Sequence, residues 1–147
     1  MEPREIQVTF DCAGPGALAE FWSAVLGYGR QAPPAGFASW EAALEAWGVP
    51  ESEYDSRDAA VPPEGSTGPR LFFQRVPQGK VVKNRVHLDV RVAPGLEGDA
   101  RMAALEEDAG RLVGLGATRV HRVDPDGGME SGFIVMQDPE GNEFCLD

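Results

Sequence analysis

Near its start the chain reads Ile6-Gln7-Val8-Thr9-Phe10-Asp11-Cys12, followed closely by Gly14-Pro15. Apolar and polar residues alternate strictly through the first stretch, which is typical of a β-strand with one buried face. Pro15 suits the first turn of a helix, where its missing amide hydrogen would have no partner. At helical spacing after it come Leu18, Phe21, Trp22, Val25 and Leu26, and then Gly27, a natural C-terminal stop.

The same order of features returns about eighty positions later. Arg85-Val86-His87-Leu88-Asp89-Val90-Arg91-Val92 alternates again, and Pro94-Gly95 interrupts it. Apolar residues then recur at helical spacing before Gly114 and Gly116: Met102, Leu105, Ala109, Leu112 and Val113. Because Val86-His87-Leu88-Asp89 is similar to Val8-Thr9-Phe10-Asp11, the sequence predicts a duplicated strand–helix unit.

More strand-like sequence follows each unit. One strand is predicted within 69–76, another within 117–123, and a hairpin joins 133–137 to 143–146 through Asp138-Pro139-Glu140-Gly141-Asn142. Between the units lies an insertion, roughly 33–68, in which Ser39 caps a short helix. The rest of the insertion is rich in Pro, Gly and acidic residues, so we predict an irregular loop over 51–68.

Composition excludes several classes of partner. The chain has 147 residues and a net charge of −11, which disfavours nucleic acid and anionic membrane surfaces, because both need clustered cations. The start shows no signal peptide and no apolar run is long enough to span a bilayer. Cys12 and Cys145 are expected to be free thiols, and we expect a cytoplasmic protein.

The polar sides of the predicted strands form the candidate site. Two interpretations stay open: these sides line a shared concave cleft, or they are an open sheet face that meets solvent. The residues on these sides are Gln7, Thr9, Asp11, Phe72, Gln74, Arg85, His87, Asp89, Glu143 and Cys145.

Three motifs carry a family resemblance. They are Asp11-Cys12-Ala13-Gly14-Pro15, Lys83-Asn84-Arg85-Val86-His87-Leu88-Asp89, and Gln137-Asp138-Pro139-Glu140-Gly141-Asn142-Glu143-Phe144. With them the chain resembles the vicinal oxygen chelate superfamily, which includes glyoxalase I, extradiol dioxygenases, fosfomycin resistance enzymes and bleomycin-binding proteins. The third motif is among the most specific, as is the first, which leads into Leu18-Ala19-Glu20-Phe21-Trp22; the second is similar to a bacterial glyoxalase-like subgroup.

The resemblance implies an α+β fold, in which two βαβββ modules form a curled mixed sheet around a shared cleft. The single domain would then cover 1–147. Module 1 would span about 1–79, with the insertion at about 33–68, and module 2 about 80–147.

The superfamily's metal positions transfer to Gln7, Gln74, His87 and Cys145, and a two-residue slip in the first strand would give Thr9 in place of Gln7. None of these is a carboxylate, whereas Mg²⁺, Mn²⁺ and Fe²⁺ prefer oxygen donors or two His with one carboxylate. Asp89 and Glu143 flank the set as substitutes. A divalent metal (Zn, Mn, Fe or Ni) is one alternative, and the missing carboxylates favour a site without metal.

Two hypotheses of function follow. In the first, a small molecule is converted at the cleft by lyase, isomerase or dioxygenase chemistry, with His87 as the central catalytic group and Asp89 orienting it. In the second, the protein binds a drug or metabolite without metal, as bleomycin-binding relatives do. Thr9, Phe72, Arg85 and Glu143 would line the cleft in both, and the resemblance further implies a homodimer.

Overall fold

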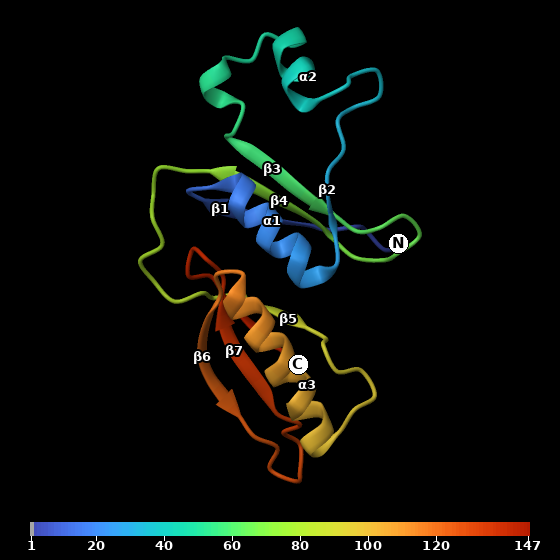
Figure 1. Ribbon diagram of the computed structural model, residues 1–147, viewed down its shortest axis with the longest axis vertical. Helices are drawn as coiled ribbons and strands as arrows, with labels where there is room; N and C mark the ends of the chain where they lie inside the picture. Colours follow the sequence, from blue (N-terminus) through green and yellow to red (C-terminus); the bar gives the residue numbers. More distant parts are fainter. Residues whose placement is uncertain (1) are drawn as a thin grey trace. The chain divides into compact units, whose positions relative to one another are not determined.

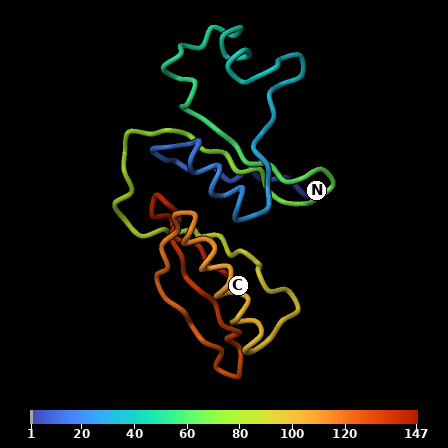
Figure 2. Tube along the Cα trace, viewed as in Figure 1, coloured from blue at the N-terminus to red at the C-terminus, as the bar shows by residue number. Residues whose placement is uncertain are grey.

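A computed structural model describes residues 2–147, which form two compact units that divide between Gly79 and Lys80 (Figures 1 and 2). We call these units module 1 and module 2. Each contains a four-stranded mixed sheet, and three α-helices complete the described chain, which confirms the predicted α+β class with two modules. Within residues 2–147, no helix combines the length and apolarity that crossing a membrane requires.

Module 1 places its strands in the order β1-β4-β3-β2. Strand β1 is parallel to β4, whereas β3 is antiparallel to both β4 and β2. The first helix, α1, packs against β3 and β4 (Figure 1). The bounds are β1 Gln7–Cys12, α1 Pro15–Leu26, β2 Gly29–Arg30, β3 Arg57–Val61 and β4 Arg70–Arg75.

Helix α1 begins and ends as predicted. Pro15 occupies its first turn, and Gly27 at its C-terminus has a φ of 67°, a left-handed conformation that favours glycine. The helix buries Trp22, whose ring lies 5.2 Å from that of Phe10 on β1. Phe10 in turn stacks on Phe73 of β4 at 5.2 Å, so an aromatic core joins the helix to the parallel strand pair.

The segment between β2 and β3 extends away from the sheet and contains α2 (Trp40–Ala46) and a short 3-10 helix, η1 (Glu51–Glu53) (Figure 2). The predicted cap is present, because the Ser39 hydroxyl accepts a hydrogen bond from the Ala42 amide at 3.1 Å. Trp40 and Trp47 meet edge to face, with their rings 6.5 Å apart.

The prediction of an irregular loop over 51–68 was wrong in part. Residues Arg57–Val61 form β3, an interior strand of the sheet that pairs with both β2 and β4. Asp58 and two alanines give this stretch low intrinsic strand preference. Pairing on both edges compensates, because the neighbouring strands satisfy its backbone hydrogen-bonding groups.

Module 2 repeats this topology with the strand order β5-β8-β7-β6. Strand β5 is parallel to β8, and the remaining neighbours are antiparallel. Helix α3 packs mainly against β7 (Figure 1). The bounds are β5 Leu88–Val90, α3 Gly98–Gly114, β6 Thr118–Val123, β7 Phe133–Gln137 and β8 Glu143–Leu146.

The predicted β7–β8 hairpin is present and is held by one buried carboxylate. Asp138 accepts hydrogen bonds from the backbone amides of Glu140 and Asn142, each at 2.9 Å. Gly141 follows with a φ of 82°, as the turn requires.

A second buried polar group anchors α3. The guanidinium of Arg101 is 8% exposed and donates to the backbone oxygens of Ser131 and Gly132 and to the carboxylate of Asp147. Asp147 also pairs with Arg91.

The first strand of module 2 is shorter than predicted. The alternating stretch 85–92 contributes only Leu88–Val90 to β5, so Arg85 and His87 lie in an irregular segment before the strand. Val86, predicted on the apolar face, is 79% exposed. Alternation alone could not show this limit, because pairing with β8 begins only at Leu88, opposite Phe144.

Candidate functional site

In module 1, the predicted site residues lie on one face of the β1–β4 pair. Thr9 stands opposite Phe72 in the parallel register, and Gln7 and Gln74 follow on the same face by the two-residue strand period. Asp11 stands opposite Gln74.

These module 1 side chains form hydrogen bonds with one another and with Arg70. The side-chain oxygen of Gln7 accepts a hydrogen bond from Arg70 at 2.5 Å, and its amide nitrogen donates to the Thr9 hydroxyl at 3.3 Å. Gln74 donates to the Asp11 carboxylate at 2.7 Å. The Arg70 guanidinium also lies 5.0 Å from the centre of the Phe72 ring. A fixed cation therefore occupies the oxygen that Gln7 would offer to a metal.

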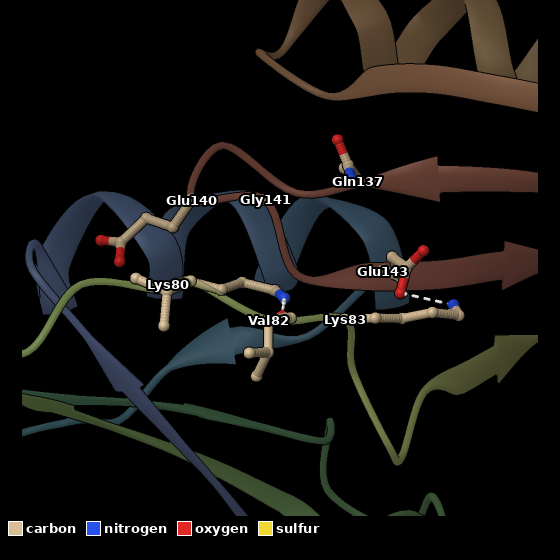
Figure 3. A pocket seen from close by; sticks show the side chains of 8 residues that line it. Lys80, Val82, Lys83, Gln137, Glu140, Gly141 and Glu143 are labelled. Carbon is tan, nitrogen blue, oxygen red and sulfur yellow. Dashed lines mark hydrogen bonds and ion pairs between the residues drawn. The ribbon is translucent and has the colours of Figure 1, made fainter.

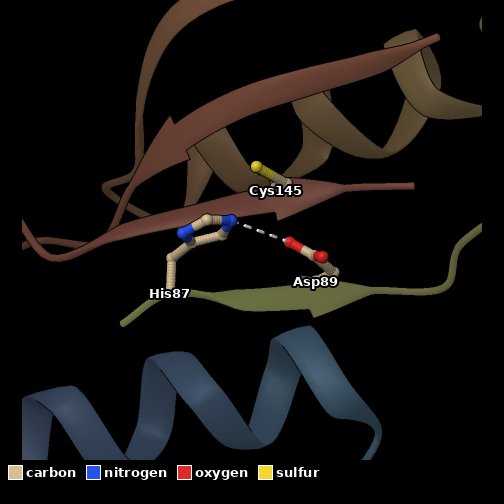
Figure 4. A group of neighbouring side chains, drawn as sticks. All are labelled: His87, Asp89 and Cys145. Carbon is tan, nitrogen blue, oxygen red and sulfur yellow. Dashed lines mark ion pairs between the residues drawn. The ribbon is translucent and has the colours of Figure 1, made fainter. Parts of the chain in front are cut away.

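In module 2, strands β5 and β8 bring together three different donor groups: the His87 imidazole, the Asp89 carboxylate and the Cys145 thiol (Figure 4). Asp89 stands directly opposite Cys145 in the parallel register. His87 Nε2 lies 3.3 Å from the Asp89 carboxylate, and both side chains are about half exposed, at 50% and 48%. We name these residues the His–Asp–Cys cluster.

The thiol of the cluster is held protonated. Burial is the main cause that raises the pKa of Cys145 to about 11, and the neighbouring Asp89 carboxylate adds to the effect. Because the thiolate is the nucleophilic form, this environment gives an unreactive thiol at neutral pH.

Beside the cluster lies an open pocket, with a volume of about 380 Å³ (Figure 3). Glu143 lies at its edge and shares one face of β8 with Cys145, two residues away. The pocket is lined by Lys80, Val81, Val82, Lys83, Gln137, Glu140, Gly141 and Glu143.

The charges of the pocket are partly paired. Lys83 donates to the Glu143 carboxylate at 2.7 Å, as Figure 3 shows. This hydrogen bond is the largest cause that holds the pKa of Glu143 below its ordinary value. The ammonium of Lys80 donates instead to the backbone oxygen of Val82.

Of the predicted cleft residues in module 2, Glu143 lines this pocket, whereas Arg85 does not. The sequence indicated neither Lys80 nor Gln137 as site residues. Gln137 ends β7, and the hairpin brings it opposite Glu143, so the β7–β8 register places it here. Lys83 is the first residue of the second motif quoted above, and this was the only feature of the sequence that pointed to it.

Comparison with known families gives a match over nearly the whole chain. The glyoxalase-like domain family matches residues 7–146. The chain belongs to this family. The superfamily resemblance inferred from the three motifs is thereby confirmed, and its fold is the one observed. A comparison with curated proteins finds no match.

Several solved structures share the fold at low sequence identity. A fosfomycin resistance protein from Listeria monocytogenes has a TM-score of 0.62 and 10% identity, over 99% of this chain and 93% of that one. A glyoxalase-related enzyme from Fulvimarina pelagi has a TM-score of 0.58 and 12% identity, over 98% and 87%. A glyoxalase/bleomycin resistance protein/dioxygenase family enzyme from Burkholderia phytofirmans has a TM-score of 0.54 and 14% identity, over 95% and 94%.

Proposed function

We propose that this glyoxalase-like protein binds a small polar molecule in the module 2 pocket and transfers a proton to or from it through His87. The observation that carries the proposal is the His87–Asp89 pair, 3.3 Å apart and half exposed, whose neighbour Cys145 shares a face of β8 with the pocket residue Glu143. Lyase and isomerase reactions use such a step.

The pair has the arrangement of a general base and the group that orients it. When Nε2 of His87 carries the proton, the Asp89 carboxylate accepts it as a hydrogen bond and stabilises the imidazolium that forms on protonation. Nδ1 is then left to take a proton from a substrate. Half of the imidazole surface is exposed, so a substrate can reach it.

The pocket determines the class of ligand. The ammonium groups of Lys80 and Lys83 and the amide of Gln137 offer donors, and the carboxylates of Glu140 and Glu143 offer acceptors. A small hydroxylated acid suits this mixture better than an extended apolar molecule. One solved neighbour, a fosfomycin resistance protein from Listeria monocytogenes with a TM-score of 0.59, is complexed with Mn(II) and a dihydroxypropylphosphonic acid, a ligand of this size and polarity.

Binding without chemistry is the second candidate function. It is favoured by the paired charges of the pocket, where Lys83 and Glu143 neutralise one another, and by the protonated Cys145 thiol, which supplies no nucleophile. A protein that sequesters a drug or metabolite needs only such a complementary surface.

The test is a screen of small hydroxy acids and hydroxyphosphonates by thermal shift, followed by nuclear magnetic resonance mapping of the bound site. We expect amide shifts at 80–90 and 137–145, and at least a tenfold loss of affinity in Lys83→Met. His87→Ala should abolish turnover of a substrate and largely retain its binding. Thr9→Ala, the matched position of the repeat in module 1, is the control.

The outcomes separate the candidates. Binding without turnover of any bound compound would favour sequestration. Shifts confined to module 1, or equal effects of His87→Ala and Thr9→Ala, would overturn the proposed site.

The homodimer implied by the family is a further part of this proposal. Light scattering on the eluting protein is its test, and a monomer at micromolar concentration would contradict it.

A further inference from the structure

We infer that the His–Asp–Cys cluster binds one divalent ion of the zinc type, using donors from module 2 alone. Among residues 2–147, the cluster is a group of three side chains of the types that bind metal ions, His, Asp and Cys. Their donor atoms all lie within 4.8 Å of one another. The inference does not need the proposed ligand, but it gives His87 and Asp89 a different role, because an imidazole bound to a metal does not act as a general base.

The donor set fits such an ion. Zn²⁺ is commonly held by imidazole nitrogen, thiolate sulfur and carboxylate oxygen, and zinc sites that keep an open position use three protein ligands. Tetrahedral coordination at the usual bond lengths places donors roughly 3.3–3.7 Å apart. His87 and Asp89 are already at 3.3 Å, so only a shift of about 1 Å is needed to bring the set together.

The scaffold allows that shift. Cys145 is buried and belongs to β8, which pairs with β5 and β7 and fixes its backbone. His87 lies before β5 in the irregular segment, so its backbone carries no ladder pairing that a small movement would break. The exposed sides of His87 and Asp89 leave room for water in an open coordination position.

This assignment departs from the ligand set that the resemblance implied. That set included Gln7 and Gln74 of module 1. In the structure Gln7 is hydrogen-bonded to Arg70, and Gln74 is hydrogen-bonded to Asp11. Here the carboxylate comes instead from β5, as Asp89. A sulfur donor also moves the preference away from Mg²⁺ and Mn²⁺, which favour oxygen, towards Zn²⁺. A bound ion would supply Lewis-acid chemistry at the edge of the pocket.

Cobalt substitution tests the inference without any organic ligand. The full chain is stripped with chelator and titrated with Co²⁺, and then Zn²⁺ displaces the cobalt. We expect one equivalent of Co²⁺, with the near-ultraviolet charge-transfer absorption of a cobalt–thiolate bond. Cys145→Ser should remove this absorption and weaken Zn²⁺ binding at least 100-fold, measured by competition with a chromophoric chelator.

Matched variants identify the donors. Cys12→Ser changes the other buried cysteine, in module 1, and should leave both the absorption and the Zn²⁺ affinity unchanged. His87→Ala and Asp89→Asn alter exposed side chains, so they test the site even if Cys145→Ser folds poorly. Each should weaken Zn²⁺ at least tenfold. Gln7→Ala and Gln74→Ala should change the affinity less than twofold.

Three results would overturn the inference. They are no uptake of Co²⁺ or Zn²⁺ by the folded wild-type chain, an absorption that persists in Cys145→Ser, and binding lost equally in Cys12→Ser. Failure here would leave the ligand screen unaffected, because that screen uses no metal.

Discussion

The two modules present the same position of the repeat with different chemistry. In module 1, Asp11 on β1 stands opposite Gln74 on β4; in module 2, Asp89 on β5 stands opposite Cys145 on β8. Two residues before each aspartate lies Thr9 in one module and His87 in the other. One scaffold thus holds two amides, bonded to Arg70 and to Asp11, and in its repeat it holds an imidazole, a carboxylate and a thiol.

This difference shows that the two halves of a duplicated βαβββ fold can carry different side chains at matched positions. On the module 1 face Gln7 bonds to Arg70 and Gln74 to Asp11, whereas at the matched positions of module 2 an imidazole pairs with a carboxylate beside a buried thiol. Three predictions sharpen or break this comparison.

The largest effect is expected where a charge is buried. Arg101→Met removes the hydrogen bonds to three partners inside module 2 and should lower the free energy of unfolding by about 3 kcal/mol, because two backbone oxygens and Asp147 lose a donor. Arg30→Met removes the more exposed Arg30–Asp58 pair of module 1 and should cost less than about 1 kcal/mol. Urea denaturation measures both. Equal losses would refute the distinction between the buried and the exposed pair.

The second effect concerns the reactivity of Cys145 in chelator-treated Cys12→Ser protein. With a pKa of about 11, little thiolate exists at pH 8, so alkylation should be at least about tenfold slower than in the unfolded chain. The rate should rise with pH as the thiol ionises. Asp89→Asn removes a negative charge, lowers that pKa and should accelerate the reaction, followed by mass spectrometry.

The control for this variant comes from the other module. Asp11→Asn makes the same change at the matched position and should leave alkylation of Cys145 unaltered. Acceleration by both substitutions would indicate general loosening of the fold rather than a local charge effect.

The smallest effect is expected for Lys83→Met. Because the pKa of Glu143 is lowered in the folded protein, the Lys83–Glu143 interaction stabilises the fold above the ordinary carboxyl pKa and is lost as pH falls through the lowered value. The variant should therefore lower Tm by roughly 1–3 °C at pH 7, and the difference should shrink as acid protonates Glu143. If the Tm difference persisted at low pH, its cause would be packing of the Lys83 methylene chain rather than the ion pair with Glu143.

Much of the fold could be predicted because its signals are local. Strict alternation in β1, Pro15 and Gly27 at the ends of α1, and the Asp138–Asn142 turn each act through neighbours in sequence. Strand β3 was missed because its formation depends on pairing with β2 and β4, which composition does not show.

The site was predictable only in part, for the same reason. His87 and Cys145 were found through resemblance, and Asp89 as a flanking substitute. The close approach of Asp89 to Cys145 depends on the parallel register of strands that lie far apart in sequence. Lys80 and Gln137 were missed because only the folded hairpin and the segment before β5 bring them together.

The brevity of β5 has a consequence for how such proteins diversify. Only Leu88–Val90 join the ladder, so the residues from Lys80 to His87 add no strand pairing to the sheet. Substitutions in this segment should therefore leave the folded core largely intact. If the proposed ligand binds here, selection could exchange it for another by small steps, none of which has to pass through an unstable protein.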